Sequence, residues 1–358
     1  MTSIGRYRIA PQGLGLMRLT SIPAADRISD EEAFEVIKTG IKAASPDRLL
    51  LNTGTFYGSP DDSLYANLQL LRRFFGKYPE LKDRVVVNVK GGIVIPELAA
   101  KGWAGMRPSA KVEDLREDLV ALRRELGSDD GGVSVHVFEM ARRDLTTDVE
   151  QTIRNLNQLR NEGLFEYIAL SEVGADTIKR AVKTAKEEGT AIVSVEVEYS
   201  PFFLDIASNG VLSTCRELFV PITVYSPCGK GFLGGQLKSR ADLPASDPRL
   251  GQEQFSEDNF PKNFKLAETF AQLAASRSPP VSSAQLALAW ISSQSTDGCA
   301  LVPIPGTTKA ERVKENMAAT EIKLSEDEVE KLNSIFASLH VAGHRYPAFM
   351  RNNGSLFA

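Results

Sequence analysis

The sequence has few of the residues that metal sites and disulfides need. Its three cysteines, Cys215, Cys228 and Cys299, are widely separated and odd in number, and it has only three histidines. So few and so scattered ligands fit neither a disulfide framework nor a zinc cluster. Basic residues are not in excess either, because 46 acidic residues outnumber 42 basic ones and leave a net charge of -4. We expect no bound metal and no nucleic-acid partner.

Long hydrophobic runs are absent as well. The first residues, MTSIGRYRIAPQG, lack the apolar centre of a signal peptide, and no segment approaches the roughly 18 consecutive apolar residues of a membrane helix. We therefore expect a soluble protein without a membrane partner. The expected location is the cytoplasm, with the nucleus as a second one. The sequence does not indicate an oligomeric state.

The sequence is rich in an alternation of two patterns. Short apolar and β-branched runs predict strands, and each of the first six is followed by a stretch with helical periodicity. The predicted strands are residues 13–19, 47–52, 83–90, 132–140, 165–171, 191–200, 221–227 and 298–305. Such alternation is typical of a parallel sheet. Eight units in one chain of 358 residues favour a closed (β/α)8 TIM barrel, with a single-domain core at about 12–338.

Two stretches fall outside this alternation. Residues 237–260 are polar and rich in Pro, Asp and Gly, so we interpret them as a long loop after the seventh strand. Residues 325–339 predict an extra C-terminal helix, and the tail at 340–358 has no periodicity, so it is either disordered or a flap over the barrel mouth. Substrate specificity is expected to depend on residues 18–28, 93–109 and 237–260 and on this tail.

The carboxyl ends of barrel strands are where catalytic residues are expected. Lys90 ends an apolar strand and precedes two glycines, where burial and neighbouring charges can shift its pKa. The alternative is that it extends to solvent at the barrel rim. Tyr57 follows the second strand, close enough to meet Lys90. An ammonium favours the phenolate, so we expect a phenol that can donate a proton near neutral pH, although a lone loop tyrosine is more often packing.

Six blocks of sequence together resemble the aldo-keto reductase superfamily in order and spacing. They are NTGTFYG at 52–58, VKGG at 89–92, EGLFEYIALSEV at 162–173, VEVEYSPF at 195–202, VYSPCGKGFLGG at 224–235 and VPIPGTTKAERVKEN at 302–316. Within the superfamily they are most similar to the fungal pyridoxal reductases. The resemblance implies reduction of a small aldehyde by NADPH, with pyridoxal as the preferred substrate. A general aromatic aldehyde is the alternative within this chemistry, and a non-catalytic NADPH-binding regulatory subunit is the alternative outside it.

The family uses an Asp, a Tyr, a Lys and a His around the substrate carbonyl. By the resemblance the Tyr falls on Tyr57 and the Lys on Lys90, whereas the Asp falls on Asn52 and the His on Ala141. His136 cannot replace that imidazole, because five residues along a strand span about 16 Å and an odd offset reverses the face. We expect it to be a packed or rim histidine.

Without the family's Asp, Lys90 would be an unpaired charge in the barrel interior, which is costly. One hypothesis is that a relocated carboxylate pairs with it. Glu139 is the first candidate, and Glu196 and Glu198, which share a strand face, are the others. The other hypothesis is that Asn52 simply hydrogen-bonds Lys90.

The resemblance also implies the cofactor contacts. Ser171, Glu172 and Glu196 would hold the nicotinamide carboxamide, at positions where relatives commonly have Asn at 172 and Gln at 196. Tyr225 would stack on the nicotinamide ring, with a strand-end core tyrosine as the alternative. The pyrophosphate would lie along Ser226, Gly229, Gly231 and Leu233, where glycines expose backbone N–H groups.

The stretch after the eighth strand is predicted to bind the 2′-phosphate of NADP(H). Gly306, Thr307 and Thr308 precede a helix beginning near Lys309, and Lys309 and Arg312 place two positive charges on one helical face. This arrangement favours NADP(H) over NAD. By the resemblance Glu315 and Asn316 would contact adenine. Candidate substrate residues are Arg142, Trp103 and Phe202 at the mouth, and the two aromatic side chains are equally explained by loop packing.

Overall fold

Eight parallel strands form the centre of the computed structural model, which describes residues 2–59, 62–347, 351 and 356–357. The strands are β3 (Leu14–Gly15), β4 (Leu49–Gly54), β5 (Val85–Gly91), β6 (Val137–Met140), β7 (Tyr167–Ser171), β8 (Ile192–Glu198), β9 (Ile222–Tyr225) and β10 (Leu301–Pro303). Each strand pairs with the next along the chain. Gly15 bridges to Gly306, and Gly13 N–H donates to the Pro303 carbonyl at 3.0 Å. The sheet therefore closes, and the predicted (β/α)8 barrel is confirmed.

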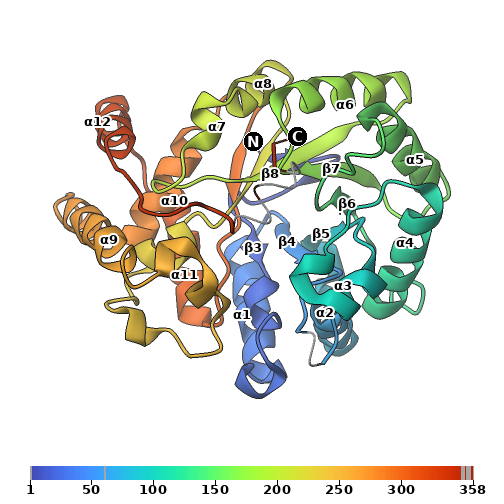
Figure 1. Ribbon diagram of the computed structural model, residues 1–358, viewed down its shortest axis with the longest axis horizontal. Coiled ribbons are helices and arrows are strands. Elements are labelled where there is room, and N and C mark those ends of the chain that lie inside the picture. The colour runs from blue at the N-terminus through green and yellow to red at the C-terminus, as the bar shows by residue number, and fades with distance from the viewer. Residues whose placement is uncertain (1, 60–61, 348–350, 352–355, 358) are drawn as a thin grey trace.

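The helices form a ring outside the strands (Figure 1). They are α1 (Asp30–Ala43), α2 (Ala66–Lys77), α3 (Ile95–Lys101), α4 (Val112–Leu126), α5 (Val149–Asn161), α6 (Ala175–Glu187), α7 (Asp205–Ser208), α8 (Val211–Glu217), α9 (Phe260–Ala275), α10 (Ser283–Ser293), α11 (Ala310–Ala318) and α12 (Glu326–Ala337). Their start signals are readable: Ser29, Ser282 and Ser325 each cap a helix through a reciprocal capping box. None of the helices in the described ranges is both long and apolar enough to cross a bilayer.

Alternation along the strands separates two apolar layers from a polar one. Outward residues such as Leu49 and Leu51 pack against the helices. Inward residues one position away, such as Leu50 and Val86, form a small apolar layer inside the barrel. The next inward positions on the same strands, toward their carboxyl ends, are polar and include Asn52, Asn88 and Lys90. The upper barrel interior is therefore a buried polar cluster.

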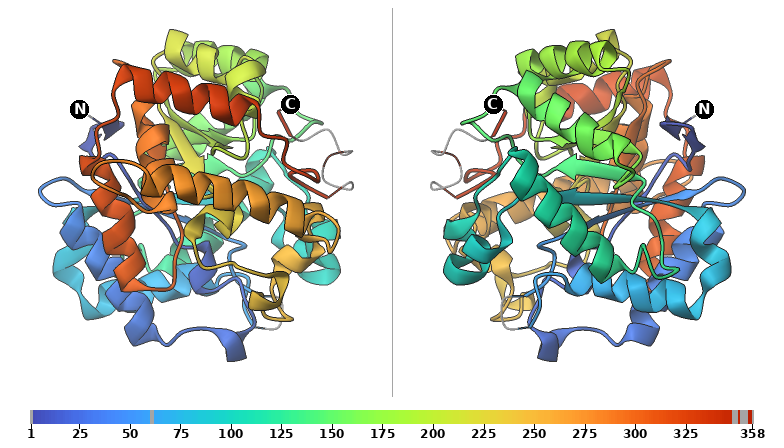
Figure 2. Two further views of the ribbon diagram at one scale, coloured as in Figure 1. Left: turned by 90° about the vertical axis from the view of Figure 1, so that its left-hand side faces the viewer. Right: turned by 90° about the vertical axis from the view of Figure 1, so that its right-hand side faces the viewer.

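A short hairpin outside the predicted core covers the amino-terminal end of the barrel. Its strands, β1 (Ser3–Ile4) and β2 (Tyr7–Arg8), are antiparallel, and two-residue strands are too short to show periodicity. The Tyr7 ring meets His136 edge-on with centroids 5.1 Å apart, and His136 Nδ1 accepts from the Val87 N–H at 3.1 Å. His136 is thus packed, as expected. The hairpin and the C-terminal segment lie at opposite ends of the barrel (Figure 2).

The region between β9 and β10 differs most from the prediction of a long loop. Residues 237–260 contain three short 3-10 helices, at Arg240–Asp242, Pro248–Gly251 and Glu253–Phe255, and helices α9 and α10 follow. Helix α10 is apolar on nearly every side because it is buried, and such a run has no distinguishing period. Phe255 anchors the loop, since its ring stacks on Phe232 with centroids 4.7 Å apart.

Candidate active site

Lys90 lies at the centre of the polar cluster in the upper barrel. Its ammonium donates to Asn52 Oδ1 at 3.1 Å, forms an ion pair with Glu196 and lies 3.4 Å from Glu139 Oε1. Asn52 completes the contact by donating from Nδ2 to Glu196 Oε2 at 2.6 Å. The side chain of Lys90 is 6% exposed, so it does not extend to solvent at the rim. Lys90 therefore contacts both a relocated carboxylate and the Asn52 amide, so the contacts of both hypotheses are present together.

The charges of this cluster are unequal in number. Lys90 faces two carboxylates, Glu139 and Glu196, both almost fully buried. Burial and the charge of Glu196 raise the pKa of Glu139, although Lys90 opposes the shift. Burial lowers the pKa of Lys90, but the two carboxylates outweigh it and the net pKa is raised. Burial and the neighbouring Glu196 therefore favour a proton on Glu139, while Lys90 stays a charged ammonium.

Tyr57 packs beside Lys90, whose Nζ lies 5.7 Å from the centre of the ring. Burial raises the pKa of Tyr57, the Lys90 charge lowers it, Glu196 and Glu139 raise it, and the result is about 12. As expected, the charge of Lys90 alone lowers the pKa of Tyr57 and favours the phenolate. The expectation is wrong for the net pKa of Tyr57, which is raised because burial of the phenol is the larger effect.

The loop that carries Tyr57 is fixed by residues that the sequence analysis did not single out. Thr20 donates its hydroxyl to the Tyr57 carbonyl at 2.6 Å, and Asn67 on α2 donates to Thr20 Oγ1 at 2.6 Å. A Cβ on Gly54 would lie 3.2 Å from the Tyr57 ring, and one on Gly58 would lie 1.7 Å from the Ser63 carbonyl oxygen. Gly58 therefore needs glycine, whereas a Cβ at position 54 would require the Tyr57 ring to shift by a few tenths of an ångström; in the sequence only these flanking glycines hinted at a tight site.

An apolar group stands where the family has its histidine. Ala141 is fully buried and clusters with Phe56, Tyr57 and Ile93. Trp103 meets Phe56 edge-on at 6.2 Å and is half exposed, so it lies at the outer edge of this cluster. The cluster leaves Tyr57 as the group beside Lys90 that carries a transferable hydroxyl proton.

The strand ends of β7, β8 and β9 carry a second group of buried polar residues. Ser171 Oγ is buried with no hydrogen-bond partner among the described residues. Glu172 has φ +57°, a left-handed conformation that Asn adopts more easily than Glu. Its carboxylate accepts from the Tyr225 hydroxyl at 2.8 Å and from the Glu198 N–H at 3.3 Å. Tyr225 is thus held by its hydroxyl at this edge of the barrel.

The C-terminal tail lies over these strand ends. Arg345 donates to both oxygens of Glu172, at 3.1 and 2.5 Å, and the Tyr346 hydroxyl lies 2.5 Å from that of Tyr225. Arg142 donates to the Tyr346 hydroxyl at 3.2 Å. Residues 348–350, 352–355 and 358 of the tail lie outside the described residues. Nothing in the aperiodic tail sequence marked Arg345 or Tyr346.

Two predicted cofactor residues have protein partners of their own. Both Glu196 oxygens contact the Lys90 and Asn52 side chains, and Glu172 is used by Tyr225 and Arg345. In the glycine-rich stretch the N–H groups of Gly229, Gly231 and Leu233 are already bonded within the loop. They do not point freely at a ligand in this form.

The glycine-rich stretch is nevertheless tightly wound. Ser226, Gly229, Lys230 and Gly231 all have positive φ. Phe202 packs on Phe232 with centroids 5.7 Å apart and is buried in the outer core. This contact supports loop packing for Phe202 rather than a pocket wall.

The segment after β10 presents an open helix terminus. Helix α11 begins after Lys309 without a side-chain cap, so its first N–H groups are not covered by a capping side chain. Thr307 and Thr308 are partly exposed beside it, and Gly306 is exposed. Arg312 is tied to Glu315 at 2.6 Å, whereas Asn316 is buried.

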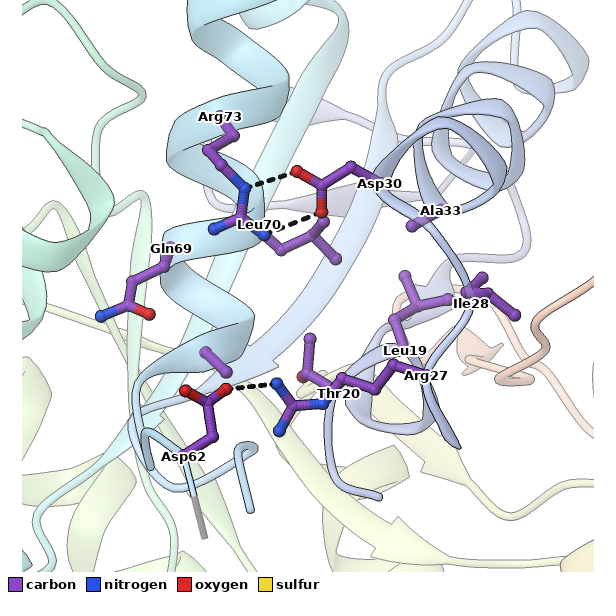
Figure 3. A pocket seen from close by; sticks show the side chains of 11 residues that line it. Leu19, Thr20, Arg27, Ile28, Asp30, Ala33, Asp62, Gln69, Leu70 and Arg73 are labelled. Atoms are coloured by element: carbon purple, nitrogen blue, oxygen red, sulfur yellow. Dashed lines mark hydrogen bonds and ion pairs between the residues drawn. The ribbon is translucent and has the colours of Figure 1, made fainter. Parts of the chain in front are cut away.

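A separate cavity of about 70 Å³ lies between the Leu19–Ile28 segment, α1 and α2 (Figure 3). In it Arg73 donates to Asp30 and Arg27 donates to Asp62. The cavity is far below the 300–1,000 Å³ of a typical ligand pocket, so we assign it no ligand. Across the described ranges, no three His, Cys, Asp or Glu side chains are grouped to hold a metal ion.

Comparisons with known proteins agree with the barrel fold. The model of the aldo/keto reductase family matches residues 12–337. The "Probable pyridoxal reductase 2" of Schizosaccharomyces pombe is 32% identical over 350 residues, covering 97% of each chain. The "Aldo-keto reductase yakc [NADP(+)]" of the same yeast is 36% identical over 96% of this chain and 93% of that protein. A glycerol dehydrogenase of Gluconobacter oxydans shares the fold, with TM-score 0.73, 17% identity and coverage of 96% and 95%.

Proposed function

Because the chain belongs to the aldo/keto reductase family, we propose that it reduces an aldehyde to a primary alcohol with NADPH and that pyridoxal is its substrate. The observation that carries the proposal is the contact of Tyr57 with a buried, charge-compensated Lys90 at the barrel mouth. A retained ammonium and phenol are the groups that carbonyl reduction needs from the protein.

The roles of the residues follow from their protonation. The raised pKa of Tyr57 keeps its phenol protonated near neutral pH, so it has a proton to give to the carbonyl oxygen. The oxygen gains negative charge during reduction, and the Lys90 ammonium stabilises that charge and the phenolate left on Tyr57. Glu196 and Asn52 keep Lys90 charged and in place. When bound, NADPH supplies the hydride.

The residues present fit the cofactor at two points. The unpartnered Ser171 hydroxyl is available to the nicotinamide carboxamide. The uncapped α11 terminus, with Lys309 and Arg312 beside it, is suited to a phosphate. Two positive charges there favour the 2′-phosphate of NADP over a free hydroxyl, and the S. pombe relative with NADP(+) in its name supports the same choice.

Pyridoxal is preferred among aldehydes for two reasons. Asn52 and Ala141 depart from the common tetrad as in the fungal pyridoxal reductases that the sequence resembles. A relative named as a pyridoxal reductase aligns over 97% of the chain. Arg142 lies at the mouth with its guanidinium on Tyr346, where it is placed to contact a polar substituent of the substrate.

The test is loss of NADPH absorbance with purified protein and pyridoxal, compared with pyridoxal phosphate, 4-nitrobenzaldehyde and NADH. Tyr57→Phe should lower kcat by about 10²–10⁴, the usual contribution of a general acid. Tyr199→Phe is the matched control, because Tyr199 is a buried tyrosine that packs on Trp290 in the outer core. NADPH binding without turnover of any aldehyde would sink the proposal and favour a regulatory subunit.

A further inference from the structure

Arg345 connects the C-terminal tail to two carboxylates at the barrel mouth. Its guanidinium bonds to both oxygens of Glu172 and lies 3.8 Å from Glu198. The side chain of Arg345 is 8% exposed and the two carboxylate side chains are fully buried. A tail that merely rested on the surface would not place a guanidinium in such a site.

Glu198 has little other compensation, whereas Glu172 also accepts from the Tyr225 hydroxyl and the Glu198 N–H. Lys230 lies 3.9 Å from Glu198, and neither oxygen of Glu198 has a hydrogen bond among the described residues. Burial pushes the pKa of Glu172 upward, but the charges of Arg345 and Arg142 outweigh it and the net pKa is lowered. Removing one partner of a buried ion pair is strongly destabilising, because it leaves the other charge buried and uncompensated. Displacement of the tail is therefore expensive.

The same tail segment fixes Tyr225 through its hydroxyl. The Tyr346 hydroxyl lies 2.5 Å from the Tyr225 hydroxyl, which also donates to Glu172. Lys230 donates to the Arg345 carbonyl at 2.6 Å and fixes the tail backbone from below. Tyr225 is thus oriented by a carboxylate that Arg345 holds and by the residue next to Arg345.

We propose that Arg345 is a positioning residue of the cofactor site, which neutralises Glu172 and Glu198 and so holds Glu172 and Tyr225 where the nicotinamide end of the cofactor binds. This inference rests on the proposed function, in which those two residues face the nicotinamide. It requires the tail to stay in place when the cofactor binds. A tail that had to leave first would instead compete with the cofactor.

The two roles predict opposite effects on cofactor binding. Arg345→Met keeps an unbranched apolar stem and removes the guanidinium with its charge. We expect it to raise the Kd for NADPH, measured by quenching of protein fluorescence, by about 10-fold or more, and to raise the KM for NADPH more than it lowers kcat. Adding Glu172→Gln removes the carboxylate left unpaired, so the double variant should recover much of the lost affinity.

The matched control is Arg154→Met, on the outer helix α5. Arg154 pairs with Glu188 at 3.3 Å, and both side chains are at least a third exposed. Its substitution should leave the Kd for NADPH within about twofold of the wild type. If Arg345→Met does not fold, Arg345→Lys replaces it. A lysine cannot bond both oxygens at once, so a smaller rise in Kd is then expected.

Three results would contradict the inference. Tighter NADPH binding by the Arg345 variant would make the tail a plug that competes with the cofactor. Unchanged binding would make the ion pair purely structural. An equally poor Kd in the Glu172→Gln/Arg345→Met double variant would show that charge compensation is not the cause. In all three the wild type still binds NADPH, whereas a wild type that binds none would overturn the proposed function and this inference together.

Discussion

Exchanging the Asn52 amide and the Glu196 carboxylate beside Lys90 should give a site equivalent to the present one. Asn52 and Glu196 contact each other at 2.6 Å and both contact Lys90. By the resemblance, the common aldo-keto reductase pattern has Asp at position 52 and Gln at 196. The double variant Asn52→Asp/Glu196→Gln swaps the two groups and keeps the number of charges, amides and hydrogen bonds.

Each single substitution should be destabilising for a different reason. Asn52→Asp places a second carboxylate at the 2.6 Å contact with Glu196, and two carboxylates at that distance cannot both ionise. Glu196→Gln leaves Lys90 with Glu139, 3.4 Å away, as its remaining carboxylate. That carboxylate must then lose its proton despite burial. We expect each single variant to lose about 1–3 kcal/mol and the pair to show about 1–3 kcal/mol of favourable coupling.

The assay is urea unfolding at pH 7, with all four proteins compared at one protein concentration. The slope of the free energy of unfolding against urea should be the same in all four, which shows that the unfolded states expose similar surface. The double variant should unfold closer to the wild type than the sum of the single effects allows. Losses that add to within about 0.5 kcal/mol would refute the exchange.

Three further predictions follow from other parts of the structure. Burial raises the pKa of Asp118 to about 7 against the lowering effect of the Gly92 N–H. Because the pKa of Asp118 is higher in the folded protein than in the unfolded chain, where it is near 4, the protonated carboxyl contributes to the free energy of unfolding below pH 4. This contribution is lost as the pH rises through 7. Asp118→Asn should therefore flatten the decline in unfolding free energy between pH 4 and 7, by at most about 4 kcal/mol at 1.4 kcal/mol per pKa unit; an unchanged slope contradicts this. Arg312→Met should raise the KM for NADPH about tenfold or more and leave that for NADH unchanged, since it removes a charge-assisted contact; equal effects on both would contradict a role at the 2′-phosphate. Phe232→Ala should lower the free energy of unfolding by about 3–5 kcal/mol in urea, because Phe232 stacks on buried Phe255; a loss under 1 kcal/mol would mean that the loop repacks.

The barrel was predictable because its strands and most helices have distinct periods. Strand runs such as VVVNVK are almost continuously apolar, as expected of strands covered on both faces, and serine capping boxes mark the starts of α1 and α12. Helix α10 gave no such contrast, since nearly all of its residues are apolar and buried. The hairpin at Ser3–Arg8 was missed because it is stabilised by contacts from below the barrel and not by its own pattern.

The tail was the least predictable part of the site. Arg345 follows a glycine and a histidine in an aperiodic stretch, and its partner Glu172 is 173 residues away along the chain. Only the fold brings them together. A clue was present at Glu172, because a glutamate at a position where relatives commonly have Asn adds a buried charge that needs a cation. The sequence shows that added charge, but only the fold identifies Arg345 as the cation that compensates it.

The choice between Glu139 and Glu196 shows why strand register alone could not identify the partner of Lys90. Glu139 was the first candidate because it lies two residues before Ala141 and shares its face, and the structure pairs it directly with Lys90 on the neighbouring strand β6. Glu196 is on β8, three strands from β5, yet it makes the closer contact. An eight-stranded barrel is so narrow that inward side chains meet across its axis. Lys90 therefore needs one carboxylate and one amide within contact distance. Either group can come from a neighbouring strand or from a strand across the barrel. We therefore expect a change at position 52 to be tolerated when position 196 changes with it.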